Sequence, residues 1–81
     1  MKRQIAEAID FLNEQLDVPD ISNHLYATLL EQRAGCFFMQ KKYVLAKGDY
    51  ESVLRYYPGI KRVLESLKDV KRKRQALNPA F

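Results

Sequence analysis

The sequence predicts a small all-α fold, a bundle of three to four helices that occupies the 81 residues as a single helical domain. Three observations support this prediction. Apolar residues recur at helical spacing along most of the chain. Prolines interrupt these amphipathic stretches at only a few points. The hydrophobic share of 47% and the aromatic share of 11% suit a packed core and argue against a chain that stays disordered.

The first predicted helix covers residues 2–17. Its apolar residues share one face at helical spacing and are Ile5, Ala8, Ile9, Leu12 and Leu16. It should end near Pro19, because proline disfavours helical geometry in the residue before it. Asp17, Asp20 and Ser22 are alternative caps for the helix that follows.

The second predicted helix is long and covers residues 21–47, since no proline occurs inside this segment. Gly35 is its weak point, because glycine costs about 1 kcal/mol relative to alanine in a helix interior. The segment could therefore divide at Gly35, or another helix could approach closely there. A β-hairpin through residues 36–39 and 43–45 is the alternative, since aromatic and β-branched residues favour strands.

Two further helices are predicted over residues 49–57 and 60–77. Lys47-Gly48-Asp49 has the pattern of a helix exit and re-entry, in which Gly48 takes left-handed geometry and Asp49 caps the next helix. Pro58-Gly59 should end or sharply kink the third helix. The first helix should fold back on the second.

An apolar stripe on the last helix is the predicted protein interface. It consists of Ile60, Val63, Leu64, Leu67 and Val70. The stripe is too short to indicate a coiled coil. It should either close the chain's own core or present itself to another protein or a second copy of the chain.

Positive charge is concentrated at the end of the chain. Residues 1–54 carry 6 basic and 8 acidic side chains, whereas residues 55–81 carry 8 basic and 2 acidic ones. The candidate contacts for an anion or a nucleic acid are Lys68, Lys71, Arg72, Lys73 and Arg74, with Tyr56 and Tyr57 as rings that could stack on bases. The other interpretation is a solvated last turn with core tyrosines.

The first helix and its exit are acidic, through Asp10, Glu14, Asp17 and Asp20. If the first and last helices pack together, or pair between subunits, their opposite charges would set the orientation. Exposed ion pairs add only about 0 to 1 kcal/mol each, so this pattern is a guide to register.

The sequence predicts no catalytic, metal or cofactor site. His24 and Cys36 are the only residues of their types, and a zinc site normally takes three or four protein ligands. Cys36 lies in an apolar stretch, where a free cysteine usually behaves as a small hydrophobe. The three glycines form no phosphate-binding loop. We therefore expect a protein that is not an enzyme.

The chain is expected to be cytoplasmic and not an integral membrane protein. Charged residues interrupt every apolar run well short of the roughly 20 residues that a membrane-spanning helix needs. Glu7 and Asp10 fall where a signal peptide would be apolar. A single cysteine cannot form an intramolecular disulfide, which agrees with a reducing compartment.

Residues 47–54 resemble the turn between the two helices of a tetratricopeptide repeat. Aligned on Gly48, however, Gln40 and Lys41 occupy positions where that family has leucine and glycine. The sequence therefore assigns no family. It favours a small non-catalytic interaction module, regulatory, adaptor-like or chaperone-like, that binds another protein or a second copy of itself. The alternative is a nucleic-acid-binding protein that uses the basic last helix.

Overall fold

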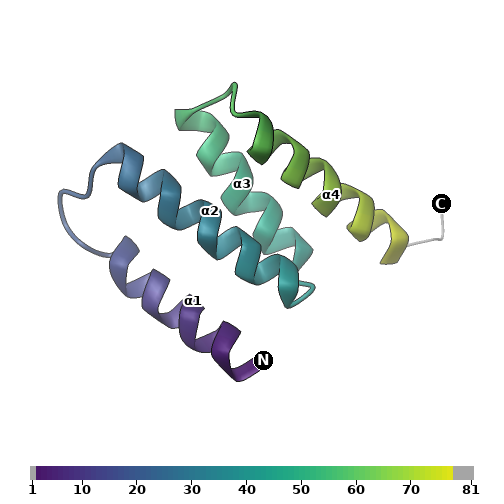
Figure 1. The fold of residues 1–81 in the computed structure, drawn as a ribbon, viewed down its shortest axis with the longest axis horizontal. Coiled ribbons are helices and arrows are strands. Elements are labelled where there is room, and N and C mark those ends of the chain that lie inside the picture. The colour runs from purple at the N-terminus through teal and green to yellow at the C-terminus, as the bar shows by residue number, and fades with distance from the viewer. Residues whose placement is uncertain (1, 78–81) are drawn as a thin grey trace.

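The computed structural model describes residues 2–77 and confirms the predicted all-α bundle. Its four helices are α1 (Lys2–Leu16), α2 (Asn23–Met39), α3 (Tyr43–Tyr56) and α4 (Lys61–Leu77). Consecutive helices run in opposite directions and lie side by side in chain order, so that α1 and α4 form opposite edges (Figure 1). The resulting array measures 44 × 33 × 16 Å. The acidic first helix and the basic last helix therefore do not pack on each other within one chain.

The turn between α1 and α2 follows the sequence closely. α1 ends at Leu16, three residues before Pro19, and Asp20 adopts a left-handed φ of 61°. Among the three candidate caps, Ser22 is the one used, since its hydroxyl accepts a hydrogen bond from the Leu25 N–H at 3.1 Å.

The predicted long helix over residues 21–47 is wrong, because a tight turn at residues 40–42 separates α2 from α3. Lys41 takes a left-handed φ of 61°, and the Lys42 N–H donates to the Phe37 carbonyl at 2.9 Å. The rings of Phe38 and Tyr43 meet edge to face across the turn, with centroids 5.5 Å apart. The turn contains neither glycine nor proline, so no local breaker indicated it.

The predicted boundary at Gly48 is also wrong. Gly48 lies inside α3, so the helix predicted over residues 49–57 is the second half of a helix that begins at Tyr43. Gly35 lies inside α2, and a Cβ atom there would meet nothing within 4 Å, so it marks neither a break nor a close approach. No strand occurs in residues 2–77, which excludes the hairpin alternative.

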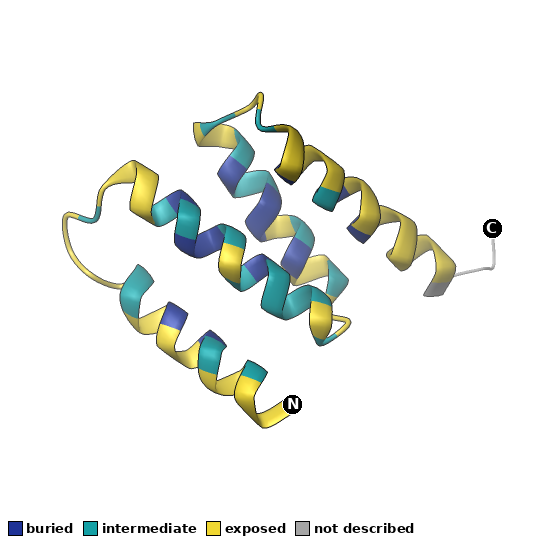
Figure 2. Cartoon of the chain, viewed as in Figure 1, coloured by how far each residue is buried: buried dark blue, intermediate teal, exposed yellow. Residues whose placement is uncertain are grey.

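The core lies along α2, α3 and the inner face of α4 (Figure 2). Ala34 of α2 and Ala46 of α3 are both fully buried, and these small side chains allow the two backbones to approach closely. Val53, Val63 and Val70 are the largest side chains buried completely. α1 covers the other side of α2, where Ile9 and Leu12 are buried.

A buried ion pair connects three of the four helices. Arg33 of α2 donates from Nε and Nη2 to the two carboxylate oxygens of Asp49 in α3, each at 2.8 Å, and from Nη1 to Asn13 of α1 at 2.8 Å. The hydrogen bonds to Asp49 raise the pKa of Arg33, so the guanidinium group keeps its charge. Asp49, predicted as a helix cap, is instead a buried partner of this arginine.

Pro58 lies in a break between two helices. α3 ends at Tyr56 and α4 begins at Lys61, so the residues around Pro58 and Gly59 form a short connection. This connection reverses the chain and places α4 antiparallel to α3 (Figure 1).

Candidate functional site

The predicted interface stripe on α4 mostly faces the core of its own chain. Val63 and Val70 are fully buried, Leu67 is buried, and Ile60 packs partly against the same cluster. Only Leu64 is exposed, with 38% of its surface accessible. The stripe therefore closes the core, and as a set of five residues it is not available to a partner. This burial agrees with the first of the two predicted alternatives, in which the stripe closes the chain's own core, because α4 packs on α3 through this face.

The predicted anion contacts are exposed but do not form one site with the tyrosines. Lys68 and all four cations of residues 71–74 are exposed on the last turns of α4. Tyr56 and Tyr57 lie at the opposite end, where α3 ends. Along the axis of α4, about 15 Å separates Lys61, where the helix begins, from Lys71, where the basic run begins.

Each of these tyrosines instead meets a ring of α2. Tyr56 packs edge to face on Tyr26 at 5.9 Å, and Tyr57 does so on His24 at 6.3 Å. They pack against α2 at the end of α3, so the structure does not bring them together with the basic run into one surface.

A pocket of about 210 Å³ opens between α2, the end of α3 and the beginning of α4. Its lining residues are His24, Ala27, Thr28, Glu31, Val53, Tyr57, Ile60 and Arg62. Ala27 and Val53 are buried and belong to the floor, whereas His24 and Arg62 are exposed. The pocket thus combines an apolar floor with a polar rim, the arrangement that binding sites commonly have.

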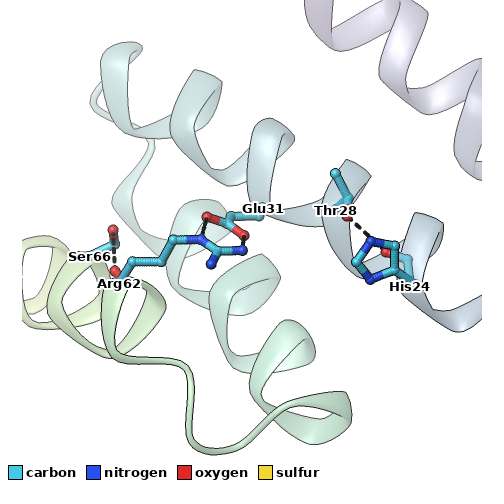
Figure 3. A network of polar contacts seen from close by, with 5 residues as sticks. All are labelled: His24, Thr28, Glu31, Arg62 and Ser66. Atoms are coloured by element: carbon cyan, nitrogen blue, oxygen red, sulfur yellow. Dashed lines mark hydrogen bonds and ion pairs between the residues drawn. The ribbon is translucent and has the colours of Figure 1, made fainter.

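The rim is held together by an ion pair between α2 and α4 (Figure 3). Arg62 donates from Nε and Nη2 to the two carboxylate oxygens of Glu31, at 2.9 and 3.1 Å. This bidentate hydrogen bond raises the pKa of Arg62. Residues 31 positions apart in sequence therefore form one edge of the pocket, and the chemistry they offer is charge and hydrogen bonding beside an apolar surface.

Two hydroxyl groups near the rim are occupied within their own helices. Thr28 Oγ1 donates to the His24 carbonyl at 2.9 Å, and Ser66 Oγ donates to the Arg62 carbonyl at 2.9 Å. These bonds orient both side chains along their helices. The Thr28 side chain is therefore held along α2 in the wall of the pocket.

The sequence did not indicate this pocket. Its residues come from three segments, and neither Glu31 nor Arg62 stands out from the other charges of the chain. The pocket could have been predicted from the correct helix boundary. If α3 begins at Tyr43 and runs back along α2, then Val53 and Tyr57 lie beside the first turns of α2. The pocket depends on the turn at residues 40–42, which sequence reasoning missed.

His24 and Cys36 lie on the same helix, 12 residues apart, which is about 18 Å along its axis. They cannot act together in this structure. Burial raises the pKa of the Cys36 thiol, which lowers its reactivity. In residues 2–77, histidine, cysteine and acidic side chains form no group of three that could hold a metal ion. None of the helices described is both long and apolar enough to cross a bilayer.

Comparison with known proteins gave no match, whether the chain was compared with protein-family models, curated proteins or solved structures.

Proposed function

We propose that this chain is a small non-catalytic helical module that binds another protein through the pocket between α2, α3 and α4. The observation that carries this proposal is the pocket's composition, an apolar floor beside the Glu31–Arg62 ion pair. A volume of about 210 Å³ is smaller than most small-molecule sites, which measure about 300 to 1,000 Å³. It suits one apolar side chain of a partner, inserted as an anchor while the rim contacts its backbone or a neighbouring polar group.

The packing of α2 on α3 supports the same class of function. Aligned on the turn that the structure shows, the chain resembles the tetratricopeptide pattern W-x2-L-G-x2-Y, A-x3-F and P. The corresponding positions are Leu30, Arg33, Ala34, Phe37, Ala46, Tyr50 and Pro58, of which Ala46 and Pro58 carry the residue that the pattern has there. An alignment on Gly48 fails because Gly48 lies inside α3 and not in a turn. Arg33 stands where the pattern has leucine, and there it binds Asp49. Repeats of this kind commonly present binding surfaces along a helical array.

A selection of displayed peptides tests the proposal. Peptides recovered on the wild-type protein are compared with those recovered on Thr28→Arg, which places a long charged side chain over the pocket. Ala6→Arg on the exposed part of α1 is the matched control. We expect peptides that share one apolar residue, bind wild type and the control alike, and bind Thr28→Arg at least tenfold more weakly. Peptides insensitive to Thr28→Arg, or none recovered at all, would contradict the proposal, provided that circular dichroism shows intact folding.

Nucleic-acid binding by α4 is the second candidate, supported by the exposure of Lys68 and the run at residues 71–74. Binding of this kind should weaken steeply as salt concentration rises. Fluorescence anisotropy of a labelled DNA duplex measures it, for wild type and for a variant with glutamine at all four positions of the run. This candidate requires salt-sensitive binding that the variant loses while its helical content stays unchanged.

A further inference from the structure

α1 and α4 form opposite edges of the helical array (Figure 1), and each carries a strip of exposed residues whose pattern matches the other. We define the α1 strip as Glu7, Phe11 and Glu14, and the α4 strip as Lys61, Leu64 and Lys68. All six residues are exposed. Each strip places one apolar side chain between two charges, acidic on α1 and basic on α4. Phe11 has 59% of its surface accessible, although phenylalanine is commonly buried.

The residues of the two strips have the same spacing when α1 is followed from its N-terminus and α4 from its C-terminus. Along α1 the steps are four residues and then three, and along α4, read from Lys68 to Lys61, they are also four and then three. Residues three and four apart lie on one face of a helix. An antiparallel contact would therefore bring Glu7 to Lys68, Phe11 to Leu64 and Glu14 to Lys61 at the same time.

The fold presents the strips in the orientation that this contact needs. Consecutive helices alternate in direction, so α4 runs antiparallel to α1 (Figure 1). A second copy placed beside the first, in the same orientation, would set its α1 antiparallel to the first copy's α4 and continue the alternation. Within one chain the two strips cannot meet, because α2 and α3 lie between them.

We propose that the partner of these two edges is a second copy of this chain, bound head to tail through the α1 strip of one copy and the α4 strip of the other. The proposal rests on the proposed class of function, protein binding, but uses a surface separate from the pocket. Because the two strips differ, the contact is heterologous and leaves a free strip at each end. Association therefore continues beyond a dimer unless a ring closes.

One pair of like charges borders the contact. Arg3 and Arg72 lie one turn beyond the ends of the matched strips and would face each other. Each already has an acidic neighbour on its own helix, Glu7 at 3.5 Å and Asp69 at 3.4 Å. These neighbours offset the repulsion. A contact of one helix face per molecule is also small, so we expect weak association that needs high protein concentration and low salt.

Sedimentation equilibrium of the whole chain at 50 mM salt, up to about 1 mM protein, tests the proposal with two charge-reversal variants. One is Glu7→Lys with Glu14→Lys, and the other is Lys61→Glu with Lys68→Glu. For wild type we expect the average mass to rise with concentration from 9.5 kDa to beyond that of two copies. Each variant alone should stay at the monomer mass, because its two edges then carry the same charge.

An equimolar mixture of the two variants should associate again, since each α1 strip then meets an α4 strip of opposite charge on the other variant. A wild type that stays monomeric would overturn the proposal. So would variants that associate as wild type does, or a mixture no heavier than its components. Peptide binding at the pocket, measured on the same variants, should be unchanged, which separates failure of this contact from failure of the proposed pocket function.

Discussion

The α2–α3 pair and the outer helices are built from different kinds of residue. Where α2 meets α3, alanines with no exposed surface and an ion pair that is mostly buried fill the contact. The outer helices α1 and α4 each bury one apolar face and leave the other face charged. The centre fixes how the chain folds, whereas the edges determine what can bind beside it.

The same residue types have different effects in these two regions. Asp49 in the centre binds Arg33 through two hydrogen bonds and has little exposed surface. Glu7 at the edge also has an arginine partner, but both side chains are mostly exposed. Exposed pairs contribute about 0 to 1 kcal/mol, whereas a buried charge that loses its partner costs several kcal/mol. The contribution of a charged residue to stability therefore depends on whether it lies in the centre or at an edge of the helical array.

The largest expected effect comes from removing the central arginine. Arg33→Met should lower the free energy of unfolding by about 3 kcal/mol, because Asp49 is left buried without a cation. A chain of this size has about 4 to 12 kcal/mol of stability in total, so the loss is large. Urea denaturation followed by circular dichroism measures it, and Arg55→Met on the exposed side of α3 is the matched control.

The double variant Arg33→Met with Asp49→Leu sharpens this result. It removes both charges, so most of the lost stability should return. Two results would contradict a stabilising role of the ion pair. In one, the free energy of unfolding of the single variant lies within about 0.5 kcal/mol of wild type. In the other, the double variant is no more stable than the single variant.

A smaller effect distinguishes the two sides of α4. Val63 is fully buried, so Val63→Ala should cost about 2 kcal/mol through lost burial and an unfilled cavity. Leu64 is the exposed neighbour, and Leu64→Ala should cost less than about 0.5 kcal/mol. Urea denaturation of both variants measures the difference. Equal costs would mean that α4 does not pack on α3 as the structure shows.

Helical periodicity predicted much of this fold. The apolar spacing of residues 2–17 and 60–77 and the prolines at positions 19 and 58 placed the outer helices and their ends close to where they lie. These signals work because they are local: a proline removes a backbone donor wherever it occurs. The same reasoning wrongly predicted a helix boundary at Gly48. This glycine lies inside α3, which packs against α2 and α4.

The turn at residues 40–42 and the pocket could not be predicted in this way. Gln40, Lys41 and Lys42 are compatible with a helix, and the turn forms because α3 gains a buried contact with α2 through Ala34 and Ala46. The pocket then depends on tertiary pairing of Glu31 with Arg62. The basic run was visible in the sequence, but only the fold shows that Tyr56 and Tyr57 lie at the other end of α4.

The smallest expected effect concerns alkaline pH and again separates the centre from the surface. Burial raises the pKa of Tyr50, and a contact with Ser66 offsets this in part. In the unfolded chain Tyr50 has the ordinary pKa of about 10 and ionises first. Its contribution to stability is therefore complete below that pKa and is lost as pH rises through the folded value. Urea denaturation between pH 8 and 11 should show a shallower decline for Tyr50→Phe than for wild type.

Tyr56→Phe is the control for this measurement, because Tyr56 is exposed and lies outside the core. It should decline with pH as wild type does. Burial also raises the pKa of Cys36, which acts in the same direction and remains in both variants, so the comparison isolates Tyr50. Identical declines for all three proteins would place the Tyr50 hydroxyl in contact with solvent. In that case water would reach the centre of the array, although Ala34, Ala46 and Asp49 are buried there.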